Sequence, residues 1–484
     1  MYEIALAIAK YFIIFLFAIF SCISFLTQKS IVQAKEQITL RLQGVLIIAV
    51  HFFSFFCIFL NAAAGNAGDI GKTSVAILYA LQLLYLIFII YVLPHIVRLS
   101  KAINNCMCML ITIGFVIQTR LSFATGRKHF IFITVSTVIY IIAALLCKKV
   151  SFLYKLTWLY YIMGLCLLLI VFIFAKLSYG AKISIDLGFV SVQPFEFTKI
   201  LFVFFTAAAF NKANDFKHVL ITAICAASYI LILVVCTELG TALILAVAYV
   251  MMLFVATKKI LYLVICIVAF AAACVVAYLL FSHVRVRVDV WLNPWSDIDN
   301  RGYQITQSLF AIGTGGWLGL GLYAGMPTYV PMVTNDFVFS AIAEELGSVF
   351  AVFLILLCLC FTLMIFRVAL KVSKPFYKLL AFGLGAVYAF QVFLEIGGAI
   401  KFIPSTGINL PFISSGGSSL VASMVLVAVI QGLYVISEAN ENRISEISDD
   451  EISLDTDDHN DIQDRIILVD PEDICDEDDG KRTE

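Results

Sequence analysis

The chain has 484 residues, of which 62% are hydrophobic and 13% are charged, and its formal net charge is −1. Soluble domains carry roughly a quarter charged residues. Here, runs of apolar residues long enough to span a membrane recur from one end of the chain to the other. The composition therefore excludes a soluble globular protein and predicts an all-α polytopic membrane protein.

The apolar runs predict thirteen spanning helices. They cover about residues 4–26, 43–63, 74–98, 103–119, 129–147, 154–176, 195–211, 218–236, 240–256, 260–281, 338–366, 377–400 and 416–437. Short loops rich in Lys and Arg fall on alternate sides of this series and are expected to be cytoplasmic. The exception is TRLSFATGRKH, residues 119–129, which the count places outside. This topology puts the N-terminus outside and the C-terminal tail in the cytoplasm.

A short polar block, VQPFEFTKI at residues 192–200, opens the seventh predicted helix. Pro194 suits the first turn of a helix, where its missing N–H is not needed. Glu196 favours the positive N-terminal end of that helix, and Lys199 lies one turn further on the same side. Two interpretations stay open: a structural ion pair, or a Lys199 ammonium that contacts an anionic substrate group while Glu196 orients it.

The longest polar segment, residues 282–337, lies on the predicted outer face and contains NPWSDIDNRGYQITQSLFAIGTGG at 293–316. Its tryptophans suit the membrane–water boundary, and residues 303–310 predict a short amphipathic helix. Asp297 differs from the other acidic residues of this loop because Pro294 and Gly302 on either side of it fix a turn. The segment re-enters the membrane after Asp336.

Seven charged residues lie at the predicted outer ends of their helices. They are Glu196, Lys199, Glu238, Glu344, Glu345, Glu395 and Lys401. A charge in or beside a span is costly and is usually functional or paired. This one-sided set therefore predicts a polar outer vestibule.

The segment KFIPSTGINLPFISSGGSS, residues 401–419, combines prolines, glycines and hydroxyl side chains just before the last helix. Non-helical backbone at membrane depth survives only where protein buries it or where it lines a cavity. A re-entrant turn here would present Ser418 and Ser419 at a helix N-terminus, which is a natural phosphate site. A plain tight turn is an equally open interpretation.

Residues 438–484 carry 19 acidic residues against four basic ones. High net charge with few aromatic residues is typical of disordered segments. The tail is interpreted either as a solvated segment or as a docking segment for a cytoplasmic partner.

Four blocks together resemble the SEDS family (FtsW/RodA/SpoVE-like), whose members are polytopic peptidoglycan glycosyltransferases. The blocks are QPFEFTK, ELGTA, the loop from NPWSDIDNRGYQITQ to NDFVFSAIAEELG, and TGINLPFISSGGSSL, in the order of the family. The resemblance covers about residues 102–437 and implies a ten-helix core with a long extracellular loop between core helices 7 and 8. Residues 1–101 would then form about three additional membrane helices, and residues 438–484 the cytoplasmic tail.

The resemblance places the essential loop aspartate of the family at Asp297, within a catalytic loop that covers residues 282–337. A carboxylate at the outer membrane surface can serve as the base that deprotonates an acceptor hydroxyl. Asp299 stays an alternative base, because Ile298–Asp299 takes the place of a usual Pro. Other departures from the family pattern are Phe195 for Ser, Glu238 for Asp, Ser415 for Tyr and Met332 for an acidic residue.

The resemblance and the predicted vestibule together give a set of candidate substrate-binding residues. They are Glu196, Lys199, Arg285, Arg287, Gln304, Asp336, Glu344, Glu345, Lys401, Ser418 and Ser419. The basic residues among them could bind a pyrophosphate, the kind of electrostatic help that is often the largest catalytic contribution. A divalent cation, Mg or Mn, is compatible with this chemistry, although the sequence contains no dedicated metal-ligand cluster.

The resemblance implies polymerisation of lipid II into glycan strands on the outer face of a bacterial cytoplasmic membrane. The transfer would invert the donor sugar and release undecaprenyl pyrophosphate. Expected partners are membrane lipid, a class B penicillin-binding protein and other division or elongation proteins, with no nucleic acid. A flippase for lipid-linked intermediates and a catalytically silent scaffold are the alternatives. A role in division, elongation or sporulation is left open.

Overall fold

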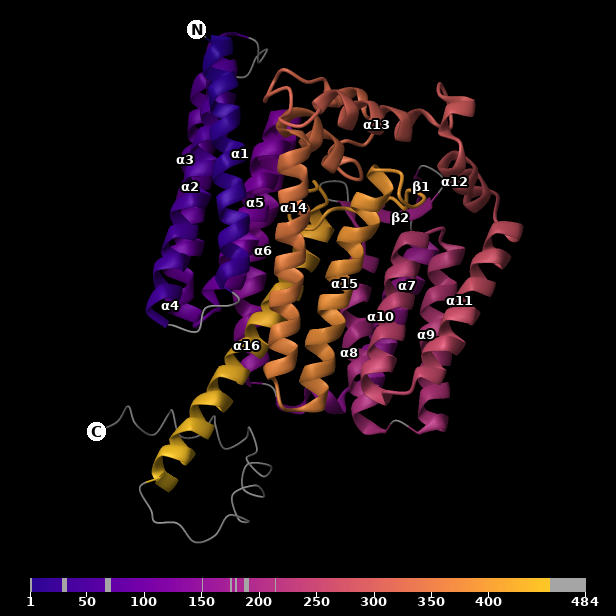
Figure 1. Ribbon diagram of the computed structural model, residues 1–484. Coiled ribbons are helices and arrows are strands. Elements are labelled where there is room, and N and C mark those ends of the chain that lie inside the picture. Colours follow the sequence, from indigo (N-terminus) through magenta and orange to yellow (C-terminus); the bar gives the residue numbers. More distant parts are fainter. Residues whose placement is uncertain are drawn as a thin grey trace.

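The computed structural model describes residues 2–27, 33–65, 71–149, 151–174, 176–178, 181–186, 191–213 and 215–452. Long helices run side by side through the whole chain (Figure 1). The first half contains α1 (Tyr2–Thr27), α2 (Gln33–Ala63), α3 (Lys72–Ile87), the π-helix η1 (Phe88–Val92), α4 (Leu93–Val97), α5 (Lys101–Leu121), α6 (Phe123–Lys149), the 3-10 helix η2 (Ser151–Lys155), α7 (Thr157–Phe174), α8 (Phe195–Lys212) and α9 (Phe216–Val235). The second half contains α10 (Leu239–Thr257), α11 (Ile260–Leu280), α12 (Ser282–Leu292), the 3-10 helix η3 (Pro294–Asp297), α13 (Tyr303–Gly315), the 3-10 helix η4 (Pro327–Tyr329), α14 (Val338–Lys371), α15 (Pro375–Ala399) and α16 (Gly417–Ile452).

Twelve helices in the described part of the chain are long and apolar enough to cross a membrane. This finding confirms a polytopic membrane protein, with one candidate span fewer than the thirteen predicted. The difference is α8, which was predicted over residues 195–211 and is present as a helix. It carries three charged residues, Glu196, Lys199 and Lys212, within 18 residues.

A small antiparallel sheet accompanies the helices of this all-α architecture. Its strands are β1 (Lys176–Ser178), β2 (Ala181–Asp186) and β3 (Ser191–Val192), in the order β1-β2-β3. Lys176 pairs with Ser184, and Ile185 pairs with Val192. The alternation Lys-Ile-Ser-Ile-Asp over residues 182–186 has the period of a strand, which is too short a signal to stand out between long apolar runs.

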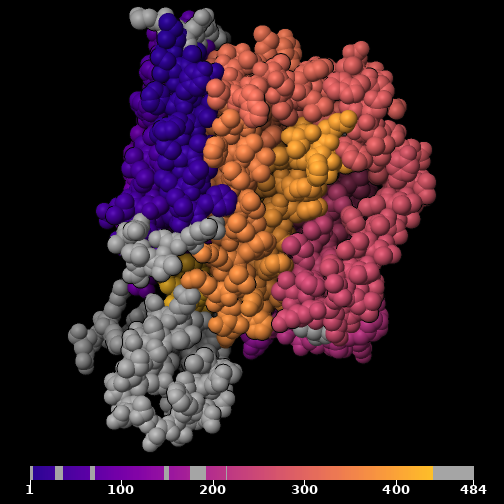
Figure 2. All heavy atoms as spheres, viewed as in Figure 1, coloured from indigo at the N-terminus to yellow at the C-terminus, as the bar shows by residue number. Residues whose placement is uncertain are grey.

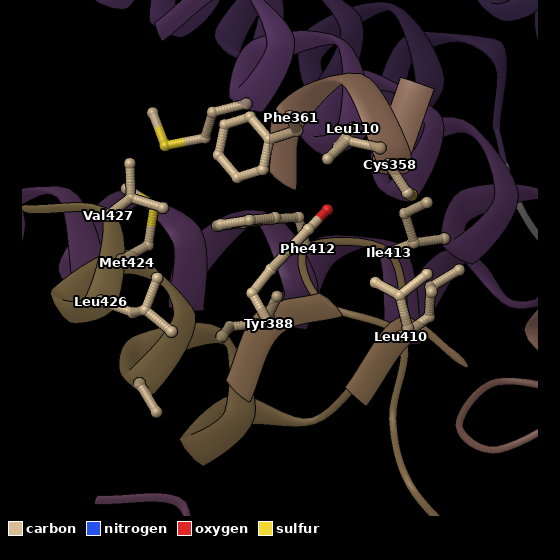
Figure 3. Packing of buried hydrophobic residues seen from close by; sticks show 14 of the residues in the cluster. Leu110, Cys358, Phe361, Tyr388, Leu410, Phe412, Ile413, Met424, Leu426 and Val427 are labelled. Atoms are coloured by element: carbon tan, nitrogen blue, oxygen red, sulfur yellow. The ribbon is translucent and has the colours of Figure 1, made fainter. Parts of the chain in front are cut away.

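The centre of the bundle is α5, in which every residue from Ile103 to Thr119 is buried. The segment 401–416 enters this core as non-helical backbone. Figure 3 shows Phe412 packed among side chains of α5, α14, α15 and α16. Its ring is fully buried and lies edge-on to Phe361 at 6.3 Å between centroids. The segment is therefore re-entrant, which is one of the two interpretations that the sequence left open.

The long helix α14 is broken at Gly347, whose φ of 86° lies outside the helical region. A break frees backbone groups, and these need other partners in a low-dielectric interior. Segment 316–321 supplies them: the N–H groups of Leu320 and Gly321 donate to the carbonyls of Glu344 and Glu345 at 3.0 and 2.8 Å. In return, the N–H groups of Ser348 and Val349 donate to residues 316 and 317.

The helices of residues 2–97, here called the N-terminal module, lie along one side of the bundle. The space-filling view shows the surface of α1 lying directly against α14 (Figure 2). α1 begins on the face of the molecule that carries α12 and α13, and α16 leaves the bundle on the opposite face (Figure 1). We call the face with α12 and α13 the loop face.

Candidate active site

A cavity of about 150 Å³ opens at the loop face beside α12 and α13. It is lined by Val286, Arg287, Val290, Trp291, Arg301, Gln304, Ile305, Asp336, Phe337, Ile403, Ser405 and Gly407. These residues come from α12, from the turn before α13 and its first residues, from the entry to α14 and from the re-entrant segment. Four stretches between residues 286 and 407 therefore meet at one polar site.

Arg287 is the charged centre of this site. Burial lowers the pKa of its guanidinium, and the carboxylates of Glu238 and Asp336 oppose this effect. Burial raises the pKa of Asp336 to about 6, against the opposing influence of Arg287. Burial likewise raises the pKa of Glu238 to about 7, again opposed by Arg287. Within the described residues, Nη1 of Arg287 is buried without a hydrogen-bond partner, so one donor is left for an incoming acceptor.

Asp336 is held in place through its neighbour Asn335. The hydroxyl of Ser414 donates to the Asn335 carbonyl at 2.6 Å, and the hydroxyl of Ser415 donates to its Oδ1 at 2.5 Å. Gln118 of α5 donates from Nε2 to the carbonyls of Thr334 and Ile413, both at 2.9 Å. One buried amide thus ties the entry of α14 to the re-entrant segment.

Asp297 ends η3 and caps the turn that follows it. Its Oδ1 accepts a hydrogen bond from Asn300 Nδ2 at 2.9 Å, and its Oδ2 accepts from the backbone N–H of Arg301 at 3.5 Å. Arg301 lines the cavity, whereas Asp297 itself is not among the lining residues. Asp297 is half-buried and Asp299 is exposed. The predicted base therefore lies next to the cavity, on the turn that carries one of its arginines.

Glu196 and Lys199 form the ion pair that was one of their two predicted interpretations. Lys199 Nζ lies 2.8 Å from Glu196 Oε2, and it also donates to Gln391 Oε1 at 3.0 Å. Lys199 is 2% exposed, and neither residue lines the cavity. The pair joins α8 to α15, while contact with substrate stays a prediction.

Glu344 and Glu345 hold the loop onto α14. Glu345 Oε1 accepts from the backbone N–H of Tyr323 at 3.0 Å and pairs with Arg120 Nη2 at 2.6 Å. Glu344 Oε1 accepts from the N–H of Met326 at 2.8 Å. Neither carboxylate lines the cavity. Sequence reasoning missed Arg120, and the signal was available: it is a basic residue on the side predicted to be outside, where a buried acid would need it.

The remaining candidates divide between the cavity and its surroundings. Gln304 lines the cavity, and its Nε2 lies 3.5 Å from the carbonyl of Pro331. The hydroxyl of Ser418 accepts from the N–H of Gln193 at 2.9 Å, and Ser419 is 3% exposed, so both serine side chains are turned into the protein. Arg285 is exposed on α12. The carbonyl of Lys401 accepts from Trp291 Nε1 at 3.2 Å.

Of the predicted set, the cavity brings together Arg287, Gln304 and Asp336. Arg301 and Ser405 are lining residues that sequence reasoning missed. Arg301 lies four residues after Asp297 in a sequence already selected, so its position in the loop was an available signal. Ser405 carried no signal of its own, because the fold of residues 401–407 decides where it lies.

No group of three or more His, Cys, Asp or Glu side chains that could hold a metal ion occurs among the residues that the structure describes. The charge of Arg287 acts on the carboxylates of Asp336 and Glu238, so a permanent cation already offsets part of their negative charge. The described residues at this site do not form a metal-ligand set.

A family profile described as "Cell cycle protein", covering FtsW, RodA and SpoVE, matches residues 100–439. The chain belongs to the FtsW/RodA/SpoVE family. The matched residues begin at the start of α5 and end in α16, and they include every residue that lines the cavity.

Members of the FtsW/RodA/SpoVE family are similar to this chain over different lengths. The peptidoglycan glycosyltransferase RodA of Mycobacterium tuberculosis is 40% identical over 267 residues, which are 52% of this chain and 57% of that protein. The chain thus spans little more than half the length of the RodA relatives that it matches. The probable peptidoglycan glycosyltransferase FtsW of Aliivibrio salmonicida is 34% identical over 67% of this chain and 84% of that protein.

Solved structures show the same fold. A chain of a peptidoglycan synthase complex that coordinates polymerization and crosslinking matches with a TM-score of 0.59 and 24% identity, over 69% of this chain and 97% of that chain. The rod shape determining protein RodA of Thermus thermophilus matches with a TM-score of 0.53 and 22% identity, over 70% of this chain and 98% of that chain.

Proposed function

We propose that this protein polymerises lipid II into peptidoglycan glycan strands at the loop face, which is the outer face of a bacterial cytoplasmic membrane. The observation that carries the proposal is the cavity, which sets Arg287 and Arg301 beside the turn of Asp297. Two cations and an adjacent carboxylate suit a reaction in which a hydroxyl attacks a sugar and a pyrophosphate leaves. The RodA relative is named a peptidoglycan glycosyltransferase and the FtsW relative a probable one.

In the proposed reaction, the acceptor hydroxyl oxygen forms a bond to the anomeric carbon of the donor sugar. The bond from that carbon to the pyrophosphate oxygen breaks, and the α-linked donor becomes a β-1,4-linked product by direct displacement. Asp297 takes the proton of the hydroxyl. Arg287 and Arg301 balance the negative charge of the departing undecaprenyl pyrophosphate.

Partners and organisation follow from the same proposal. A class B penicillin-binding protein would cross-link the strands, in line with the crosslinking complex that contains a chain of the same fold. The other division or elongation proteins would act around this pair. Residues 1–101 would be an addition to the ten-helix core of residues 102–437, with the N-terminus outside. The acidic tail of residues 438–484 would be cytoplasmic, and from residue 453 onward it lies outside the described residues.

The test is polymerisation of lipid II by the purified full-length protein, alone and with a class B penicillin-binding protein. Loss of a general base typically costs 10²–10⁴-fold in rate, so Asp297→Ala should lower the polymerisation rate by about that factor. Asp299→Ala is the matched control, because it removes an exposed carboxylate two residues away and should keep the wild-type rate.

Three outcomes would overturn parts of this proposal. Equal product from wild type and Asp297→Ala would remove Asp297 as the base, and loss of product in Asp299→Ala alone would transfer that role to Asp299. Movement of labelled lipid across vesicles without polymer would replace the glycosyltransferase by a flippase. Full complementation of a depletion strain by Asp297→Ala would favour a scaffold.

A further inference from the structure

The N-terminal module contacts the rest of the protein at α5 and at the part of α14 that follows the break at Gly347. The ring of Phe17 stacks on Phe350, three residues after the break, with 4.1 Å between centroids. Asn105 Nδ2 of α5 donates to Gln43 Oε1 of α2 at 3.2 Å. Both partners of each contact are buried. The module is therefore docked in a defined register.

One contact reaches beyond the helices to the loop itself. Lys10 Nζ donates to the carbonyl of Gly319 at 2.9 Å, across 309 residues of sequence. The aliphatic part of the same side chain lies against Gly321, where an added Cβ would be 3.8 Å from Lys10 Cδ. Hydrogen bonds from a charged donor are roughly twice as strong as neutral ones. Lys10 thus binds the segment that pairs with the α14 break.

Ordering this segment has a high entropic cost. It belongs to GTGGWLGLG, residues 313–321, and glycine loses more backbone entropy on ordering than any other residue. Gly319 also adopts a φ of 70°, which side chains rarely tolerate. Four backbone hydrogen bonds join the segment to residues 344–349 of α14. The hydrogen bond from Lys10 joins it to the N-terminal module.

The same segment is joined to the cavity by a short rigid helix. α13 runs from Tyr303 to Gly315, directly before the segment. Gln304 and Ile305 in its first turn line the cavity. A helix of 13 residues is about 20 Å long, so α13 connects segment 316–321 directly to the cavity wall.

We propose that Lys10 is a positioning residue: it fixes segment 316–321 on α14 and so sets the place of α13 in the cavity wall. The inference rests on the proposed function for its activity readout only. It gives the N-terminal module a task in the glycosyltransferase, although the module contributes no residue to the cavity.

The experiment compares Lys10→Met, Lys10→Arg and wild type as full-length proteins in detergent. Hydrogen exchange of the 316–321 amides should become at least about tenfold faster in Lys10→Met, the effect expected from losing a hydrogen bond to a charged group. Lys10→Arg keeps a donor at the end of a long side chain and should restore slow exchange. The kcat/KM for lipid II polymerisation should fall about tenfold in Lys10→Met and recover in Lys10→Arg.

Lys72→Met is the matched control. It removes an exposed lysine at the start of α3 in the same module, and should change neither exchange nor polymerisation. If Lys10→Met does not fold, Lys10→Gln takes its place, since its shorter uncharged amide weakens the same contact.

The outcomes separate this inference from the proposed function. Unchanged exchange of residues 316–321 in Lys10→Met overturns the inference, and so does faster exchange with wild-type polymerisation. If wild type makes no polymer, the proposed function fails, while the exchange result still decides whether Lys10 holds the segment.

Discussion

Burial and the charge of Arg287 act in opposite directions on two carboxylates. Asp336 and Glu238 are forced toward the protonated form by burial and toward the ionised form by the guanidinium. The balance of these two effects gives Asp336 a pKa of about 6 and Glu238 a pKa of about 7, close to the pH at which enzymes work. Small changes in the charge of a bound substrate can therefore move protons at this site.

This arrangement predicts a pH dependence of stability. Both pKa values are raised above the ordinary 3.8 and 4.5, so the folded protein binds more protons than the unfolded chain between about pH 4 and 7. The contribution of these groups to the free energy of unfolding is complete below the ordinary values. It is lost as the pH rises through about 6 and about 7. Arg287→Met removes the cation that lowers both pKa values, so the loss should move to higher pH.

The measurement is the thermal unfolding temperature in detergent from about pH 4.5 to 9. Arg285→Met, which removes the exposed arginine two residues away on α12, should follow the wild-type curve. Identical pH profiles for Arg287→Met and wild type would show that Arg287 does not act on the two carboxylates.

At the scale of elements, the break of α14 is a built feature. Gly347 interrupts the helix with a φ of 86° and packs against the backbone of Gly319. The groups released by the break are paired with residues 316–321, so the loop and the helix stabilise each other. Glu344 and Glu345 add side-chain bonds on the same turn.

Gly347→Ala should lower the free energy of unfolding by about 1–3 kcal/mol, because alanine is strained at this φ and its Cβ would press on the loop backbone. The thermal unfolding temperature in detergent measures the effect. Gly313→Ala on α13 is the control, since the space around Gly313 is open and alanine there should be neutral or slightly stabilising. Equal stability of both variants would contradict a strained, closely packed Gly347.

The elements also show where sequence reasoning succeeds. Long apolar runs located the spans, because only helices satisfy every backbone group inside a membrane. The breaks and re-entries depend on contacts between distant segments, and no local pattern reports them. Arg120 and Glu345 are 225 residues apart, so the sequence displayed both charges without indicating that they pair. The same limit explains why the hydrogen bonds of Glu345 and Glu344 to the backbone of Tyr323 and Met326 could not be predicted.

At the scale of the whole molecule, the loop face and the opposite face carry different chemistry. The cavity lies on the loop face beside α12 and α13, and the C-terminal end of α16 projects from the opposite face (Figure 1). The candidate site could be predicted as a region because its charges share the loop face of the molecule. Its actual members could not, because four separate segments define the cavity wall.

The orientation of the two faces is testable by labelling. Asp299→Cys places a thiol on the loop, and Lys259→Cys places one at the other end of α11, a candidate membrane span. A membrane-impermeant maleimide should label Asp299→Cys in intact cells and Lys259→Cys only after permeabilisation. The native chain, with 13 cysteines, serves as the blank. The reverse pattern would place the loop in the cytoplasm.

The amide of Gln118 bears on how the molecule is made. It binds the carbonyl of Ile413, which is synthesised 295 residues later. At roughly 5–20 residues per second, ribosomal synthesis separates the two by on the order of 15–60 seconds. The hydrogen bonds to Asn335 likewise form only after Ser414 and Ser415 have been synthesised. The cavity wall therefore closes only when the re-entrant segment has been inserted, so a nascent chain that stalls before it has no finished site to offer a substrate.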